Sequence, residues 1–346
     1  MTIKNARDEA IKKLTNSPTA PLDADVLLSH TIKCSKSFLL AHRNDDLTDA
    51  QYGAFMSAIE KRKTGLAVAY ITGHKEFYKL DFIVTQDVLV PKPDTETLVE
   101  KAVESIKELV RNKTTSTGKA VRTAEAPKKN AETTEQNEGG QTDDTLRIAD
   151  ICTGSGCVGI AAARELNECG IFCELTLTDI SSRALEIAKQ NAERLLTKAQ
   201  FERTAFVSSD LLNALSPGTR FDAILANPPY VPSDEVTELL KDGRGDPALA
   251  LDGDADGALG TRESSDGLAI TRRLAAQAYE HLVQGGMLFL ESGEYNAKEA
   301  AHLMKKAGFV RVETHCDLSG RPRVTTGRRS SIVYLPQCSH VSSCLL

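Results

Sequence analysis

At 346 residues, with 41% hydrophobic and 26% charged side chains, the chain has the composition of a folded globular protein, long enough for one large domain or two smaller ones. A net charge of −6 argues against a protein that binds nucleic acid over its whole surface. There is no N-terminal signal segment, no apolar run near the roughly 18 residues of a membrane span, and no C-x-x-C pair among eight cysteines. We therefore expect a cytoplasmic protein that uses neither a membrane nor a metal ion.

The first part of the chain has the spacing of short amphipathic helices. Segments such as "DADVLLSHTI" and "DAQYGAFMSAIEKR" place apolar residues three or four positions apart, which predicts a helical domain over residues 1–75. The next stretch, "AYITGHKEFYKLDFIVTQDVLV", is rich in β-branched and aromatic residues and predicts a strand or hairpin. "PKPDTETLVEKAVESIKELV" then predicts a helix with prolines at its start. Residues 76–111 are thus expected to form a hairpin and a connecting helix.

Residues 112–145 differ in composition from their surroundings. The segment has no aromatic residue and, apart from Val121, only alanine as apolar content. Such a stretch cannot bury enough surface to offset the entropy of ordering it, so we expect a disordered insertion. Residues 337–346 are expected to be a loose tail.

Strand and helix patterns alternate over residues 146–336. Strands are expected at "LRIADI", "CELTLTDI", "RTAFVSSD", "FDAILAN", "MLFLES", "FVRVET" and "SSIVYLP", with a looped excursion from Tyr230 to Ser265. The alternation predicts an α/β fold with a mostly parallel sheet wrapped by helices, which binds its ligands at the carboxyl ends of the strands.

A glycine-rich sequence joins the first of these strands to the next helix. Gly154-Ser155-Gly156-Cys157-Val158-Gly159 is a G-x-G-x-x-G pattern, and Asp179 ends the following strand. Glycines let the backbone turn tightly beside a ligand, and an acidic residue at this spacing can bind ribose hydroxyls. The pattern predicts a ribose-containing cofactor and leaves open a dinucleotide or S-adenosylmethionine.

The segment "NPPY", Asn227 to Tyr230, ends another buried strand and favours S-adenosylmethionine over a dinucleotide as the cofactor. Hydride transfer has no use for it. In an amino-group methyltransferase, however, the side-chain carbonyl of Asn227 and the backbone carbonyl of Pro228 can accept hydrogen bonds from both N–H groups of the target nitrogen. The prolines stiffen the loop, and the ring of Tyr230 offers a flat wall for a planar amide or base. No strong general base is needed, because an N-alkylated amide nitrogen becomes very acidic as the bond forms.

With these residues the chain resembles the HemK/PrmC family, the protein-(glutamine-N5) methyltransferases that modify peptide chain release factors. The resemblance covers nearly the whole chain outside 112–145 and includes "DADVLLSH", "VLVPKPDTETLVE", "DICTGSGCVGIA", "ANPPYVPSDE" and "DLSGRPRV". It implies a class I S-adenosylmethionine-dependent fold with a seven-stranded sheet and a small N-terminal helical domain that meets the protein substrate. The implied reaction methylates the glutamine of a Gly-Gly-Gln motif, and we expect a monomer that does not contact nucleic acid directly.

The resemblance also implies roles for particular residues. Cofactor binding is expected from Cys152, Thr153, Gly154, Ser155, Gly156, Asp179, Asp210, Leu211 and Asn227, with Asp210 and Leu211 near the adenine. The target glutamine is expected at Asn227, Pro228, Pro229 and Tyr230, among which Asn227, Pro228 and Tyr230 are the catalytic residues. The chain departs from the family's usual Arg and Glu at Lys92 and Asp94, and from its commoner glycine at Cys152.

Other classes of protein are weighed against this interpretation. The sister glutamine methyltransferase of a large-subunit ribosomal protein shares the catalytic motif, but "PKPDTE" favours the release-factor enzyme. A DNA adenine or rRNA base methyltransferase would need a strongly basic recognition region with aromatic residues, which this acidic chain lacks. A non-catalytic binding protein would not need an intact cofactor turn, Asp179 and "NPPY" together. A nicotinamide dehydrogenase would retain a dinucleotide rather than S-adenosylmethionine, so the retained cofactor separates these classes.

Overall fold

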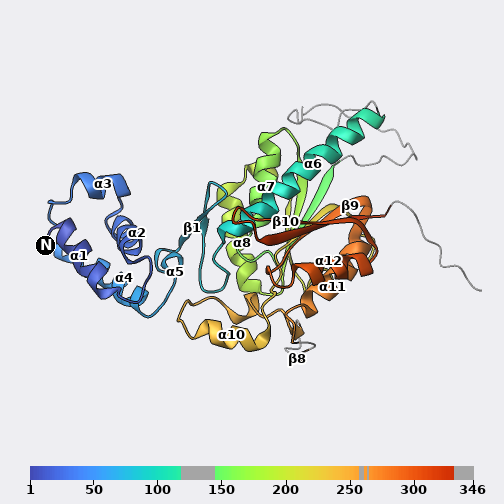
Figure 1. The fold of residues 1–346 in the computed structure, drawn as a ribbon. Helices are drawn as coiled ribbons and strands as arrows, with labels where there is room; N and C mark the ends of the chain where they lie inside the picture. Colours follow the sequence, from blue (N-terminus) through green and yellow to red (C-terminus); the bar gives the residue numbers. More distant parts are fainter. Residues whose placement is uncertain (118–144, 257–260, 263–264, 331–346) are drawn as a thin grey trace, which may run out of the picture.

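The computed structural model describes residues 1–117, 145–256, 261–262 and 265–330. A group of short helices at the N-terminus stands beside a larger body built on a sheet (Figure 1). The helices are α1 (Ile3–Lys13), α2 (Ala20–Ile32), α3 (Lys36–Ala41), α4 (Asp49–Lys63), α5 (Val68–Thr72), η1 (Pro93–Thr95), α6 (Glu96–Thr117), α7 (Cys157–Glu168), α8 (Ser182–Leu195), α9 (Lys198–Phe201), α10 (Ser233–Leu240), η2 (Ala248–Ala250), α11 (Ala269–His281) and α12 (Ala297–Lys306). The strands are β1 (His74–Phe77), β2 (Leu80–Ile83), β3 (Leu146–Ile151), β4 (Cys173–Asp179), β5 (Thr204–Ser208), β6 (Phe221–Ala226), β7 (Ala255–Asp256), β8 (Thr261–Arg262), β9 (Leu282–Glu291), β10 (Phe309–Cys316) and β11 (Pro322–Arg329).

Helices α1 to α4 share a hydrophobic core of their own. Its largest members, Leu27, Leu28, Phe55 and Ile59, are fully buried between α2 and α4. Helix α4 begins with a capping box in which the Thr48 hydroxyl accepts from the Gln51 N–H and the Gln51 side chain accepts from the Thr48 N–H. The apolar spacing read from the sequence therefore does produce short packed helices here.

The central sheet has seven strands in the order β10-β11-β9-β6-β3-β4-β5. Strands β9, β6, β3, β4 and β5 run parallel, while β11 pairs antiparallel with both β9 and β10. The chain builds outward from β3 in one direction and then returns to add β6 and β9 on its other side. This arrangement confirms the expected class I methyltransferase fold and places a topological switch point between β3 and β6.

Two layers of helices cover the sheet (Figure 1). Helices α6, α7 and α8 bury one face, and α11 and α12 bury the other. Side chains alternate accordingly along β3, where Ile148 joins the first core while Ala149 and Ile151 join the second. With both faces covered, the ligand-binding edge is left at the strand ends.

A buried asparagine on α8 ties three segments together. Asn191 is fully buried, and its amide oxygen accepts from the Ile83 N–H at 2.7 Å. Its Nδ2 donates to the carbonyl oxygens of Ile83 and Ser155, both at 2.9 Å. The β1–β2 hairpin and the glycine turn after β3 are thus held to the same side chain.

The N-terminal helices meet the loop after α10 through two glycines. A Cβ at Gly65 would lie 1.8 Å from the Asp242 carbonyl oxygen, and one at Gly243 would lie 2.0 Å from that of Thr64. Beside them, Ala67 N–H donates to the Arg244 carbonyl oxygen at 3.1 Å. Only residues without a side chain allow these two backbones to approach so closely.

Two sequence expectations differ from the structure. Helix α6 runs to Thr117, so the start of the 112–145 segment is helical, while residues 118–144 lie outside the described residues. The excursion from Tyr230 to Ser265 contains α10. In addition, "PRVTTGRR" (322–329) forms β11 between β9 and β10, where Val324, Thr325 and Thr326 are buried, and the sequence pattern did not predict this strand. The strand predicted at "SSIVYLP" (330–336), after its first residue, and the loose tail predicted at 337–346 lie outside the described residues.

Candidate active site

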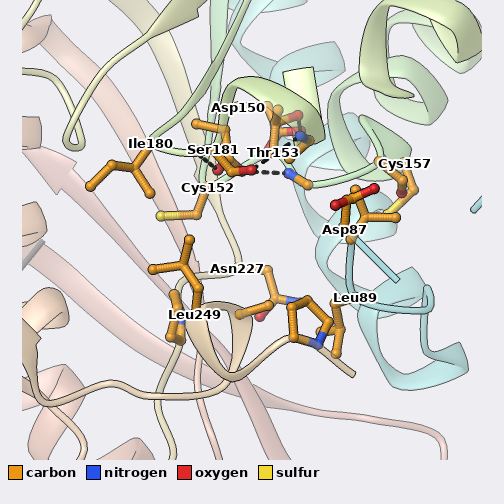
Figure 2. Close-up of a pocket in the computed structure, with 18 of the residues that line it drawn as sticks. Asp87, Leu89, Asp150, Cys152, Thr153, Cys157, Ile180, Ser181, Asn227 and Leu249 are labelled. Carbon is orange, nitrogen blue, oxygen red and sulfur yellow. Dashed lines mark hydrogen bonds between the residues drawn. The ribbon is translucent and has the colours of Figure 1, made fainter. Parts of the chain in front are cut away.

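A cavity of about 340 Å³ opens at the switch point, at the carboxyl ends of β3, β4 and β6. Of the residues predicted from sequence, it is lined by Cys152, Thr153, Gly154, Ser155, Asp179, Asp210, Leu211, Asn227 and Pro229. In Figure 2, Asn227 and Leu249 face the turn that carries Cys152 and Thr153 from the other side of the cavity. The glycine turn and the "NPPY" segment, whose nearest residues Gly159 and Asn227 are 68 positions apart in sequence, thus border one cavity.

The glycine turn between β3 and α7 requires glycine for two physical reasons. Gly154 and Gly156 have φ values of 53° and 81°, in the left-handed region. A Cβ at Gly159 would lie 2.7 Å from a Leu177 methyl and 2.9 Å from the Asp150 Cβ, so glycine lets α7 pack onto the sheet. Cys152 also has a positive φ, 57°, at the position where the resemblance leads one to expect glycine.

Asp150 supports this turn from within β3 and was not predicted as a site residue. Its carboxylate accepts hydrogen bonds from the Thr153 hydroxyl at 2.6 Å and from the Gly159 N–H at 2.9 Å. Burial raises the pKa of Asp150 to about 7, against the effect of these hydrogen bonds. An acidic residue inside an apolar strand could have indicated this role from the sequence, because a buried carboxylate needs hydrogen-bond partners.

Asp179 ends β4 beside the glycine turn. One carboxylate oxygen accepts from the Gly154 N–H at 2.8 Å and the other from the Ser181 N–H at 2.9 Å. Burial raises the pKa of Asp179, while these backbone donors oppose the rise. Each oxygen retains acceptor capacity for a ligand, since a carboxylate offers about four lone-pair sites.

Asp210 and Leu211 follow β5 on the same side of the cavity. Arg273 of α11 binds Asp210 with two hydrogen bonds, at 2.8 and 3.2 Å, which fixes the orientation of the carboxylate. Leu211 is buried with a φ of 56°. Arg273 lines the cavity as well, and sequence reasoning missed it because nothing local marks an arginine on an amphipathic helix.

The "NPPY" segment leaves β6 and is held at both ends. The Asn227 Nδ2 donates to the Thr95 hydroxyl at 3.3 Å. The Tyr230 carbonyl oxygen accepts from the Asn296 Nδ2 at 3.1 Å and from the Tyr295 hydroxyl at 3.2 Å. Pro228 is buried, and neither Pro228 nor Tyr230 is among the described residues that line the cavity. Burial raises the pKa of the Tyr230 phenol, so its ring stays uncharged at neutral pH.

The two charged departures from the family pattern both have partners. Lys92 lines the cavity, and its Nζ lies 3.7 Å from Asp246. Asp94 accepts a hydrogen bond from Arg323 at 3.1 Å. Each departure therefore keeps the charge of the residue it replaces and pairs with an opposite charge.

Comparisons with known proteins cover both parts of the chain. The model of the PrmC N-terminal domain matches residues 5–73, and that of the methyltransferase small domain matches residues 138–243. The release factor glutamine methyltransferase of Koribacter versatilis is 33% identical over 334 residues, which is 95% of this chain and 99% of that protein. The chain belongs to this family.

Further relatives of this methyltransferase carry the same name. The release factor glutamine methyltransferase of Moorella thermoacetica is 32% identical over 93% of this chain and 97% of its own length. A solved release-factor-specific protein-(glutamine-N5) methyltransferase from Alicyclobacillus acidocaldarius is 25% identical, covering 72% of this chain and 99% of that one, with a TM-score of 0.35. The near-full-length relatives of more than 30% identity confirm the family resemblance stated from the sequence.

The described residues were also compared with the requirements of a membrane-spanning helix and of a metal site. Within the described ranges, every helix is too short or too polar to span a lipid bilayer. Those same residues contain no cluster of three or more His, Cys, Asp or Glu side chains that could hold a metal ion.

Proposed function

We propose that this enzyme transfers a methyl group from S-adenosyl-L-methionine to the side-chain N5 of the glutamine in the Gly-Gly-Gln motif of peptide chain release factors. The observation that carries the proposal is the hydrogen bond between Asn227, in the cavity wall, and Thr95 of the "PKPDTE" segment. That contact joins the general amino-methylation motif to the segment that distinguishes release-factor enzymes. The near-full-length likeness to relatives of that name supports the same substrate class.

The cavity has the donors, acceptors and space that an adenosyl group needs. A Cβ at Gly154 would meet no atom within 4 Å, so the turn borders open space. We assign the ribose hydroxyls to Asp179, and the adenine to the apolar side chains of Ile180, Leu211 and Leu249. When bound, S-adenosylmethionine supplies an electrophilic methyl group on a positively charged sulfur.

The protein's contribution to the chemistry is to hold the acceptor nitrogen. An amide nitrogen is a poor nucleophile because its lone pair is delocalised. The Asn227 Oδ1 and the Pro228 carbonyl accept hydrogen bonds from its two N–H groups, which orients the lone pair and favours the positive charge that develops there. The uncharged ring of Tyr230 packs against the amide plane, and Pro229 stiffens the loop. The proton then leaves to solvent without a strong general base, because the alkylated amide is very acidic.

The proposal also covers the protein partner, the oligomeric state and the cellular location of the enzyme. Helices α1 to α4 engage the release factor, and the glutamine enters the cavity from that partner. The enzyme acts as a monomer in the cytoplasm, on protein rather than on nucleic acid, in keeping with its net charge of −6.

The decisive assay incubates the protein with S-adenosylmethionine and a release factor and maps the methyl group by mass spectrometry. The Asn227→Ala variant should lower kcat by about a hundredfold, the scale for one preorganised polar contact in a transition state. Its affinity for S-adenosylmethionine should change much less. Methylation of DNA or RNA, or a strong preference for a ribosomal-protein glutamine, would contradict the substrate. Unchanged turnover in Asn227→Ala would contradict the mechanism.

A further inference from the structure

A chain of two hydrogen bonds runs from the acceptor site into the core. The Asn227 Nδ2 donates to the Thr95 Oγ1 at 3.3 Å, and the Thr95 hydroxyl donates to the Glu291 Oε1 at 3.2 Å. The three residues come from the end of β6, from η1 and from the end of β9. Thr95 and Glu291 are each only 2% exposed, so water does not compete for these contacts.

We propose that Thr95 and Glu291 are positioning residues that fix the Asn227 carboxamide with its oxygen, and not its NH2, toward the target nitrogen. The inference rests on the proposed function, in which Asn227 must accept a hydrogen bond. A carboxamide can turn over end for end at almost no steric cost, because its oxygen and nitrogen ends have nearly the same shape. In the turned orientation the NH2 would face the N–H groups of the glutamine, and donor would meet donor.

The charge of Glu291 decides which group donates in each of the two hydrogen bonds. An ionised carboxylate only accepts hydrogen bonds, so Glu291 obliges the Thr95 hydroxyl to donate to it. The Thr95 oxygen then has only lone pairs to offer Asn227, and only the Nδ2 end of the carboxamide can use them. The Asn227 oxygen is left for the cavity.

The charge state of Glu291 therefore matters. Burial and, to a lesser extent, the charge of Asp94 raise its pKa to about 7, opposed by the hydrogen bond from Thr95, by the charge of Arg323 and, least, by a hydrogen bond with Asn227 itself. The ionisable groups that face this carboxyl are Arg323, Asp94, Tyr230 and Cys157. A protonated Glu291 can donate to Thr95, which frees the hydroxyl to donate in turn to the Asn227 oxygen and admits the wrong orientation. The correct orientation is thus enforced at pH values above about 7 and relaxed below that.

The test uses three variants of the full chain. Thr95→Val removes the hydroxyl and keeps the shape, Glu291→Gln removes the acceptor-only character, and Thr95→Ser is the matched control that keeps the hydroxyl. Side-chain amide NMR signals of Asn227, assigned with Asn227→Ala, report the hydrogen bond without any substrate. Release-factor methylation over a pH series gives kcat and KM, and calorimetry gives the affinity for S-adenosylmethionine.

In the wild type, the Asn227 amide signals should shift with a midpoint near pH 7, and kcat should rise through the same range. Thr95→Val and Glu291→Gln should lose both dependences and lower kcat by about tenfold or more, with cofactor affinity within about threefold of wild type. Thr95→Ser should retain the wild-type profile. If Glu291→Gln does not fold, Thr95→Val against Thr95→Ser decides the matter.

The inference would be overturned if the Thr95→Val variant showed the same Asn227 amide signals and the same pH profile of kcat as the wild type. A purely structural role would lower the melting temperature of the variants while leaving the pH dependence in place, and that result would overturn it too. If the wild type methylates a different acceptor, the proposed function fails, whereas the amide signals still decide whether Glu291 and Thr95 orient Asn227.

Discussion

Replacing Asn191 by alanine should destabilise the protein by about 3–5 kcal/mol. The side chain is fully buried and makes three hydrogen bonds, of 2.7, 2.9 and 2.9 Å, to backbone groups of Ile83 and Ser155. Each buried backbone group that loses its partner costs about 1–3 kcal/mol. The total lies toward the lower part of the summed range because water can enter the space left by the amide.

Urea unfolding followed by circular dichroism measures this change, with Gln190→Ala as the matched control. Gln190 is the preceding residue on α8 and is exposed, so its replacement should alter the free energy of unfolding by less than about 0.5 kcal/mol. Because Asn191 also holds the Ser155 carbonyl, the folded variant should bind S-adenosylmethionine more weakly than wild type. A loss of stability no larger than that of Gln190→Ala would refute the reasoning.

Two further predictions concern the aspartates of the cavity. Asp179→Ala should weaken S-adenosylmethionine binding by about 1.5–3 kcal/mol, and unchanged calorimetric affinity in a folded variant would contradict the assigned ribose contact. Burial raises the folded-state pKa of Asp150 from 3.8 to about 7, so its contribution to stability is present below the lower value and is lost as the pH rises to the higher one. Asp150→Asn should flatten that fall in the free energy of unfolding, measured by urea titration at several pH values, and an unchanged slope would show that Asp150 does not titrate in this range.

The parts of the site that the sequence could predict are those whose signals are local. Gly154 and Gly156 sit between a strand and a helix, Asp179 ends the next strand, and Asn227 ends another, so each can be found from spacing alone. Parallel strands bring their carboxyl ends to one edge, which is why Gly154, Asp179 and Asn227 share a cavity.

The residues that escaped prediction act through long-range contacts. Thr95 and Asn227 are 132 positions apart, and Asn191 and Ile83 are 108 apart. No local pattern distinguishes Asn191 from the other polar residues of an amphipathic helix, or Arg273 from a solvent-exposed cation. Strand β11 escaped prediction for a related reason. A proline, a glycine and three arginines interrupt the β pattern of "PRVTTGRR", whereas β11 gains its stability from ladders on both sides and from the burial of Val324.

The glycine contact between Gly65 and Gly243 has a consequence for how a whole release factor would be selected. It holds the N-terminal helices against the loop after α10 beside a second cavity of about 660 Å³, so we expect it to limit how far the helices can shift and to restrict the span from them to Asn227. A partner that docks on the helices must present its glutamine at that one distance, whatever residues flank it. A short glutamine peptide cannot bridge the span and would gain only the contacts of the cavity. If the release factor docks on the helices as proposed, we expect the enzyme to prefer an intact factor over a peptide, because Gly65 and Gly243 hold the docking surface at a restricted distance from the cavity.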